Sequence, residues 1–234
     1  MSDILENAIN ICDLFQNPDI LKHFSSEELA ELSHEKKSIS YKKGELIIEE
    51  GATPRGIYFI EKGTAKLFKL GFNGKEQIIR FTKEGDIIGY RSILSHQPFG
   101  ASATAMDDTE VCFIPEKFFL KILEFHPKFA FDVLRRIAED LGESAETITF
   151  LAQKTVRERL AEVLILLEQK LGTDADGFIN ITLTREEMAN LIGTATESAI
   201  RLISEFRTDK LIEVDGRRMK ILDHQKLIKL GHVN

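Results

Sequence analysis

Long apolar runs and cysteines are both scarce in this chain of 234 residues. No apolar run approaches the roughly 20 residues that a membrane-spanning helix needs, so no membrane partner is expected. The start, MSDILEN, lacks the basic-then-apolar layout of a secretion signal. The two cysteines, Cys12 and Cys112, lie far apart, which argues against a disulfide scaffold and predicts a reducing, cytoplasmic setting.

Metal-binding side chains do not cluster in the sequence either. The six histidines, at positions 23, 34, 96, 126, 224 and 232, show no metal-ligand spacing. An enzyme of the cupin type would need a clustered His/Glu set in its strands. We therefore predict no metal site and no enzymatic activity. A haem bound by His96 is an alternative that the pattern leaves open, although a loop histidine is more often simply solvated.

Positive charge is in deficit over the whole chain, whose net charge is −7, but it is unevenly distributed. Beyond residue 200 there are eight basic and five acidic residues, a net +3, so the rest of the chain carries −10. For a nucleic-acid binder the distribution matters more than the sum. The C-terminal end could therefore bind DNA.

The length and a hydrophobic content of 43% favour two domains. Residues 1–35 have the pattern of short amphipathic helices, including SSEELAELS with a serine cap. From Tyr41 to about Val111, β-prone runs alternate with glycine turns, as in an antiparallel barrel or jelly roll. These runs are ELIIEE, GIYFIEKG, TAKLFKL, EQIIRF, DIIGY, ASATAM and EVCFI. Asn73 and Gly74 predict a tight hairpin with two positive-φ residues.

After Pro115 the pattern is helical, and one long segment carries an apolar seam. Its positions seven apart are Leu134, Leu141, Ile148 and Thr155, with Ile137, Ser144 and Leu151 between them. Such a seam suits the pairing of two long helices, so we predict a dimer interface through this helix. The alternative is a single helix packed on its own barrel. A further helix, VRERLAEVLILLEQKLG, the linker TDADG and a strand, FINITL, follow.

Two short helices with their own start signals come next. Thr184 precedes Glu187 by three residues, and Thr194 precedes Glu197 by three, so both pairs predict a capping box. Gly193 between them suits a left-handed turn. The first helix should bury Met188, Leu191 and Ile192, and the second Ala199, Leu202, Ile203 and Phe206. This pattern is typical of a helix-turn-helix.

The second of these helices would turn a polar face outward, consisting of Thr196, Glu197, Ile200, Arg201 and Ser204. Arg matches guanine O6 and N7, Glu accepts from cytosine N4, and an aliphatic group contacts a thymine methyl. Asp215 and Gly216 lie between two alternating runs and predict a hairpin, which would form a wing with Arg217, Arg218 and Lys220 at its tip. Phosphate contacts are expected from Thr184, Arg185, Thr194, Arg217 and Arg218.

The order β-roll, long helix, winged helix-turn-helix resembles the Crp-Fnr family of bacterial transcription regulators. The resemblance covers nearly the whole chain and is strongest in EEGATPRGIYFIEKGTAKL, EGDIIGYRSIL and LTREEMANLIGTATESAIRLI. It implies an α+β protein with an N-terminal sensor β-roll (1–125), a dimerisation helix (126–154) and a DNA-binding domain (155–234). It also implies a homodimer on palindromic double-stranded DNA that acts with RNA polymerase. Glu197 and Arg201 match the family's pair that reads the G·C pair of a TGA core.

The resemblance also locates an effector pocket, at Gly89, Tyr90, Arg91, Ser92, Gly100, Ala101 and Ser144. Where cyclic-nucleotide binders of the family have Glu, this chain has Tyr90, and the stretch around Gly100 and Ala101 has no Arg. A phosphate would lose its charge-assisted contact there, although Arg91 could substitute. An iron–sulfur centre needs about four thiolates, which two cysteines do not supply. The cofactor and the effector therefore stay unknown, with cyclic AMP not expected.

Two other functions are compatible with parts of this pattern. A cyclic-nucleotide-binding module that regulates a partner protein would share the roll, but the wing and the helix-turn-helix argue against it. A cupin-type enzyme would share the jelly-roll architecture and lacks the metal ligands described above. The prediction is a sequence-specific DNA-binding regulator with a possible small-molecule effector.

Overall fold

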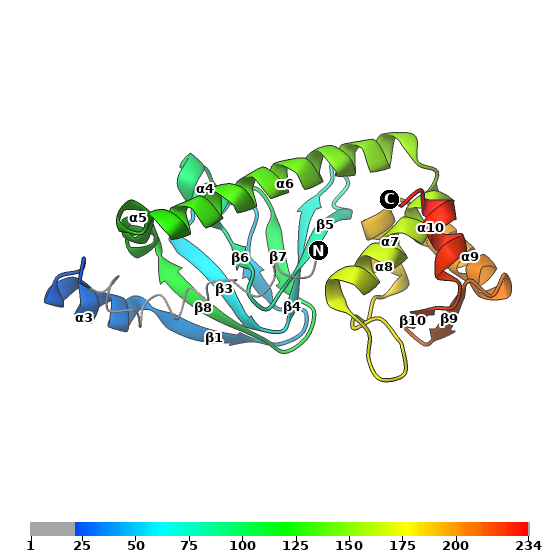
Figure 1. Cartoon of the computed structure of the whole chain (residues 1–234), viewed down its shortest axis with the longest axis horizontal. Coiled ribbons are helices and arrows are strands. Elements are labelled where there is room, and N and C mark those ends of the chain that lie inside the picture. Colours follow the sequence, from blue (N-terminus) through cyan, green and yellow to red (C-terminus); the bar gives the residue numbers. More distant parts are fainter. Residues whose placement is uncertain (1–21, 234) are drawn as a thin grey trace. The chain divides into compact units, whose positions relative to one another are not determined.

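The computed structural model describes residues 22–233 (Figure 1). Cys12 and the helical segments expected before residue 22 lie outside this range. The chain forms two compact units, one ending at Leu141 and the other beginning at Gly142, and the segment Leu70–Ile79 is assigned to the second. None of the helices within the described range is long and apolar enough to cross a membrane.

The first unit is built on two antiparallel sheets that form the predicted β-roll (Figure 1). One sheet has the strand order β1-β8-β3-β6 and the other β2-β7-β4-β5. The strands are β1 (Lys37–Tyr41), β2 (Leu46–Ile48), β3 (Gly56–Lys62), β4 (Thr64–Leu70), β5 (Glu76–Lys83), β6 (Ile87–Ile88), β7 (Ser102–Ala105) and β8 (Thr109–Pro115). The sequence pattern missed β1, whose KSISY is largely exposed, because an edge strand without buried residues has no apolar alternation.

The central strand β3 is apolar on both faces, which explains its continuous run of hydrophobic residues. Ile57 and Phe59 belong to one core cluster, together with Phe118 and Phe119 of a helix. Ile60 belongs to a second cluster, inside the roll. Because both faces of this strand are covered, its side chains alternate between two cores rather than between core and water. Cys112, 1% exposed, lies in the first cluster as a buried thiol outside any disulfide.

Helices cover one face of the roll. They are α3 (Ser26–Glu35), α5 (Glu116–Phe125) and the start of the long α6 (Pro127–Gln153), while α4 (Tyr90–Ser95) follows β6 directly. The serine cap expected for α3 is present as a capping box of Ser25 with Glu28. Phe129 and Val133 of α6 are buried, and Ile137 packs against the same cluster. Helix α6 ends at Gln153, so Thr155 is not part of the apolar seam; it caps the next helix through Glu158.

The hairpin at Asn73 and Gly74 differs from the two-residue turn that the sequence predicted. The Gly71 N–H donates to Lys75 O (2.8 Å) and the Gly74 N–H donates to Gly71 O (2.9 Å). Gly74 alone has positive φ, at 76°. The loop is therefore longer than expected, a turn followed by one left-handed residue that glycine alone accepts without strain.

The second unit contains the winged helix-turn-helix. Its elements are α7 (Val156–Leu171), α8 (Arg185–Ile192), α9 (Thr196–Thr208), β9 (Ile212–Asp215), β10 (Arg218–Ile221) and α10 (His224–Gly231). The expected strand FINITL forms only one isolated bridge, between Ile179 and Thr173. Its apolar side chains pack inward at Phe178, Ile179 and Leu183, so burial rather than strand pairing explains the apolar pattern.

The two helices of the motif begin differently, which corrects one of the two predicted capping boxes. Thr184 caps α8, and its hydroxyl accepts from the Glu187 N–H at 3.0 Å. Helix α9 instead begins after Ala195 without a side-chain cap. The Thr194 N–H is used to close α8, donating to Ala189 O at 2.9 Å, so the chain needs one more extended residue before α9 begins. Gly193 has φ 64°, the left-handed turn that was predicted.

This difference predicts unequal stabilities for two matched variants. Thr184→Ala removes a capping hydrogen bond and should lower the free energy of unfolding by about 1 kcal/mol. Thr194→Ala removes no cap and should lower it by clearly less. Urea denaturation of both variants measures the difference, and equal losses would contradict the capping assignment.

Candidate DNA-binding interface

Helix α9 has one face buried in its own unit and the opposite face in solvent. Ala199, Ile203 and Phe206 are at most 3% exposed, whereas Leu202 is half-buried. The exposed face consists of Glu197, Ile200, Arg201 and Ser204, with Thr196 half-buried at the helix start. The partner helix α8 buries Met188 and Ile192 as expected, and its Leu191 is half-buried. A buried inner face fixes the helix, so the outer face is presented in a defined orientation.

Glu197 and Arg201, the predicted base-reading pair, are free of intramolecular bonds. Among residues 22–233, neither side chain takes part in a hydrogen bond or an ion pair. Glu205, the other candidate partner for Arg201, pairs with Arg157 at 2.9 Å. Because α9 begins one residue later than predicted, Glu197 is its second residue and completes no capping box. Both charged groups are therefore available to a ligand.

The residues expected to hold phosphates at the start of α8 are already engaged. The Thr184 hydroxyl accepts from one backbone amide and donates to the Glu187 carboxylate at 3.0 Å. Arg185 Nη2 donates to the carbonyl of Gly216 at 3.1 Å, which ties α8 to the turn of the wing. Partial burial lowers the pKa of Arg185 from its usual value. Arg185 and Thr184 therefore shape the surface around α9.

The predicted wing is present as the hairpin of β9 and β10, in which Asp215 pairs with Arg218. Gly216 is the first of its two turn residues and has φ 58°, which a type II′ turn reserves for glycine. Arg217, the second turn residue, is exposed and makes no hydrogen bond or ion pair within the described range. The tip of the wing therefore carries one free guanidinium.

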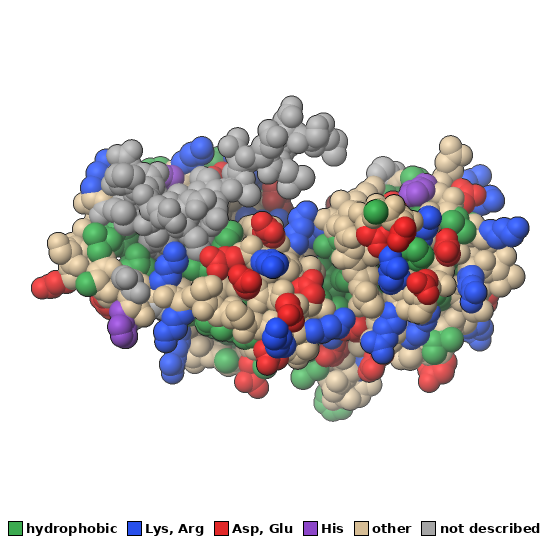
Figure 2. All heavy atoms as spheres, turned by 90° about the horizontal axis from the view of Figure 1, so that it is seen from below, with side chains coloured by type: hydrophobic (Ala, Val, Ile, Leu, Met, Phe, Trp, Pro, Cys, Tyr) green, Lys and Arg blue, Asp and Glu red, His purple; other side chains and the backbone are tan. Residues whose placement is uncertain are grey.

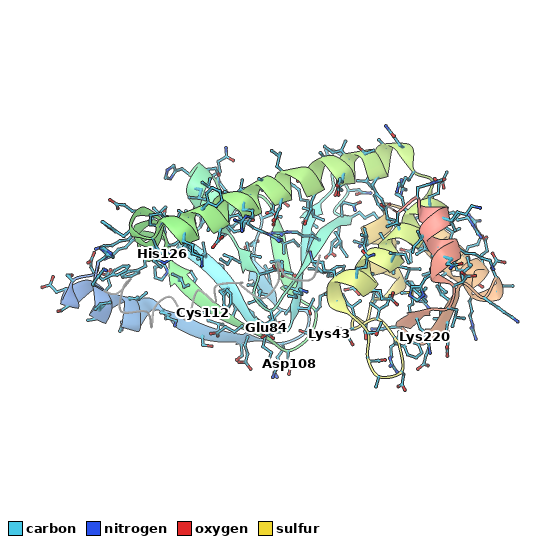
Figure 3. All side chains as sticks on the ribbon, viewed as in Figure 1. Lys43, Glu84, Asp108, Cys112, His126 and Lys220 are labelled. Atoms are coloured by element: carbon cyan, nitrogen blue, oxygen red, sulfur yellow. The ribbon has the colours of Figure 1, made fainter. Side chains whose placement is uncertain are left out.

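The other two basic residues of the wing are bound to the preceding loop. Arg218 pairs with Asp174, and its guanidinium lies 4.2 Å from the centre of the Phe178 ring. Lys220, labelled on β10 in Figure 3, donates to the carbonyl of Asp176 at 2.8 Å. Basic and acidic side chains are interspersed on the face drawn in Figure 2. Of the three basic residues of the wing, Arg217 is the one without a hydrogen bond or ion pair among the described residues.

Most residues predicted to line an effector pocket lie in the first unit, around the start of α4, whereas Ser144 belongs to the second unit. Tyr90 is 4% exposed, and its hydroxyl donates to the carboxylate of Asp140 on α6. Burial, with the hydrogen bond to Asp140 second, raises the pKa of Tyr90 to about 12, so the hydroxyl stays protonated. Arg80 Nη1 and Arg136 Nε lie 3.1 Å and 3.2 Å from Asp140 Oδ1. Two guanidinium groups and one hydroxyl thus converge on a carboxylate of the same chain.

The other predicted pocket residues surround the glycines. Gly89 has φ 91° and begins α4, and the buried Ser92 hydroxyl donates to Pro98 O at 3.3 Å. The exposed Arg91 lies against Gly100, where an added Cβ would be 2.3 Å from its Nη2. Ala101 is half-buried, and Ser144 lies in an exposed part of α6. Arg91 therefore lies next to Gly100, although the sequence around Gly100 contains no arginine of its own.

Arg80, Arg136 and Asp140 were missed by the sequence analysis. Asp140 lies 50 positions from Tyr90 and 60 from Arg80. In the sequence, Asp140 is a charged residue on a polar turn of a helix, and its neighbours do not indicate which distant residues it contacts. Within residues 22–233, no group of three or more His, Cys, Asp or Glu side chains could hold a metal ion.

Comparison with known proteins matches both units. Residues 38–126 match the cyclic nucleotide-binding domain, and residues 158–230 match the Crp-like helix-turn-helix domain. Electron transport regulator A of Shewanella oneidensis is 32% identical over 207 residues, 86% of this chain and 80% of that protein. The fumarate and nitrate reduction regulatory protein of Vibrio cholerae is 28% identical over 221 residues, 93% of this chain and 86% of that protein.

The fold is similarly shared with solved structures. FixK2 from Bradyrhizobium japonicum superimposes with a TM-score of 0.73 at 22% identity, covering 83% of this chain and 96% of that one. These relatives and neighbours are transcription regulators rather than enzymes. From the two matched domains and the relative at 32% identity, the chain belongs to the Crp-Fnr family of DNA-binding transcription regulators.

Proposed function

We propose that this regulator binds a palindromic DNA site as a homodimer and reads each half-site with Glu197 and Arg201. The observation that carries this proposal is the state of these two side chains. Both are exposed on the outer face of α9, and within the described range neither is hydrogen-bonded or ion-paired. A base-reading side chain must be free in this way, because a contact to DNA would otherwise have to replace an internal one.

The chemistry of the face suits the edges of base pairs in a major groove. Arg201 can donate two hydrogen bonds to guanine O6 and N7, and Glu197 can accept one from cytosine N4. Ile200, 47% exposed between them, can contact a thymine methyl group. These three groups match a half-site that contains a TGA-like core.

Phosphate contacts would hold this helix in register. The proposed contacts come from Arg217 at the wing tip and from the N-terminal ends of the two helices, at Thr184, Arg185, Thr194 and Thr196. Arg218 is held by Asp174 and would contribute mainly by fixing the wing. The free guanidinium of Arg217 is therefore the proposed main phosphate contact of the wing.

Dimerisation is supported by an apolar row that α6 leaves exposed. Leu134, Leu141 and Ile148 are 60%, 72% and 69% exposed. Four positions after each of them lies an exposed small residue: Ala138, Ala145 and Ala152. This alternation of four and three residues is the seam of a two-stranded coiled coil, in which small residues allow close approach. Ile137 instead packs on the roll, so we propose the alanines in its place, with Ser144 and Leu151 at the edge of the seam.

We further propose that three segments of the chain have separate functions. Residues 1–125 would sense a signal, residues 126–154 would dimerise, and residues 155–234 would bind DNA next to a promoter, where the dimer acts on RNA polymerase. Relatives named as transcriptional activator proteins support the last step. The effector, if the roll binds one, would not be cyclic AMP, because Tyr90 stands where the family's binders have Glu, and Arg80 and Arg136 are both paired with Asp140.

The dimer proposal predicts the effect of charges in the apolar row. Leu141→Asp combined with Ile148→Asp should yield monomers, because both helices would bring two carboxylates into an apolar seam. The control is Glu143→Ala with Glu146→Ala, which changes the net charge by two units in the opposite direction, away from the row, and should stay dimeric. Sedimentation velocity distinguishes the two, and a dimeric Leu141/Ile148 variant would contradict the proposal.

The base-reading proposal predicts a change in sequence preference. Arg201→Ala should lose about 1–3 kcal/mol of discrimination at one guanine in each half-site, while weak salt-sensitive binding persists. The selected sites should contain half-sites about 10 bp apart, one helical turn, as a two-fold dimer requires. Selection from a randomised duplex library measures both. If Arg201→Ala selects the same sequences as the wild type, Arg201 reads no base.

The wing predicts a different signature. Arg217→Ala should weaken binding to all sequences alike and reduce the slope of log K against log salt by about 1.8, since each protomer of the proposed dimer loses one phosphate contact. Titration of a selected and a scrambled duplex at several salt concentrations measures the slope. An unchanged slope would remove Arg217 from the phosphate contacts.

The sensor unit predicts a negative result with cyclic AMP. Calorimetric titration should show no binding at micromolar concentrations, because the two arginines nearest Tyr90 are paired with Asp140. Arg91→Ala is the informative variant. Micromolar binding that this substitution abolishes would show that Arg91 supplies the cation for the phosphate.

A further inference from the structure

Arg159, on the first turn of α7, is a buried cation. It belongs neither to the helix-turn-helix pattern nor to the proposed DNA contacts. It is 8% exposed. Its Nη1 donates to the carbonyls of Leu151 and Lys154, at 3.0 and 3.1 Å, and its Nη2 donates to the carbonyl of Gly193 at 3.2 Å. The first two carbonyls belong to the end of α6, and the third belongs to the turn that leads into α9. One guanidinium therefore joins the long helix to the helix-turn-helix.

The electrostatics of this position are unusual because helix ends, rather than carboxylates, compensate the charge. No carboxylate pairs with Arg159 in the part of the chain that the structure describes. Leu151 lies in the last turn of α6, and Gly193 is the C-terminal cap of α8. Each helix C-terminus carries about −0.5 of an elementary charge on its unsatisfied carbonyls. Burial lowers the pKa of Arg159 from its usual value, but an arginine stays protonated.

A second contact links the same two segments. A Cβ built on Gly193 would lie 2.9 Å from Leu151 Cδ2, so the Leu151 side chain packs closely on the turn. Gly193 is left-handed, with φ 64°, and a larger residue there would be strained as well as crowded. The end of α6 thus fixes the turn through a packing contact and through the three hydrogen bonds of Arg159.

We infer that Arg159 is a positioning residue for DNA binding, which sets the orientation of the recognition helix α9 relative to the end of α6. The proposed dimer is built on α6, so the two α9 helices can match two half-sites only if each is fixed to its own α6. A planar guanidinium suits this task because its donors form a rigid fork, whereas a lysine ammonium is a single point on a flexible stem. Arg159 acts through Gly193 and touches no DNA itself.

The test compares Arg159→Lys with a matched change on the same helix. Arg157→Gln removes two partly exposed ion pairs, with Glu205 of α9 and with Asp209 directly after α9, at 2.9 Å each, and should change affinity by no more than about twofold. Arg159→Lys should lower the ratio of selected-site to scrambled-duplex affinity by about tenfold or more, since hydrogen bonds from a charged group are lost. The affinity for the scrambled duplex should stay unchanged. The protein should remain a dimer with the same net charge.

The affinity ratio separates positioning from mere stabilisation. A variant that is only less stable loses active protein, which lowers binding to both duplexes alike. If Arg159→Lys keeps the wild-type ratio, Arg159 is a stabilising residue and the inference is wrong. A ratio that falls equally in Arg157→Gln would also overturn it.

A measurement on the wild-type protein covers the case in which Arg159→Lys does not fold. Amide hydrogen exchange should slow in peptides at the end of α6 and at the Gly193 turn together when the selected duplex binds, and should not slow in this way with the scrambled duplex. Slowing at the turn and α9 alone would show that the two segments are not coupled, which contradicts the positioning role.

Discussion

Helix α6 carries apolar side chains on two faces, and the part of the chain that the structure describes covers only one of them. Its first turns bury Phe129 and Val133 against the roll. From Leu134 onward a second apolar row faces solvent, with Leu141 72% exposed. Burying such side chains is worth about 1.5–3 kcal/mol each, so a second copy of the helix has a strong driving force to cover them. In the proposed dimer this row would be buried between the two copies of α6.

The polar groups of the two units follow a simple division. In the first unit, Arg80 of β5, Arg136 of α6 and Tyr90 of α4 all contact the carboxylate of Asp140, so these polar groups are engaged within the chain. On α9, Glu197 and Arg201 are left without internal partners. The contacts of Asp140 favour a fixed position of α6 on the roll. The side chains of Glu197 and Arg201 can instead bind a partner outside the chain.

Local patterns in the sequence predicted the elements whose cause is local. The Thr184 cap, the Gly193 turn, the wing and the strands of the roll depend on neighbouring residues, and the structure confirms them. The cap expected at Thr194 failed because its amide was needed to end α8, and FINITL was apolar because it is buried rather than because it pairs. Other features depend on residues far apart in the chain, which sequence periodicity does not predict. They are the absence of a partner for Arg201 within the described range, the pairing of Arg218, the contacts of Asp140 and the three carbonyls that Arg159 binds.

The outer face of α9 makes no hydrogen bond or ion pair to the part of the chain that the structure describes. The helix is held in its unit by its buried face and by the ion pair of Glu205 with Arg157, and not by the side chains at positions 197, 200 and 201. Substitutions on an exposed helix face of this kind usually change stability by less than about 0.5 kcal/mol. If α9 reads DNA as proposed, a few changes on this one helix face would give a new DNA target without altering the roll or the apolar row of α6.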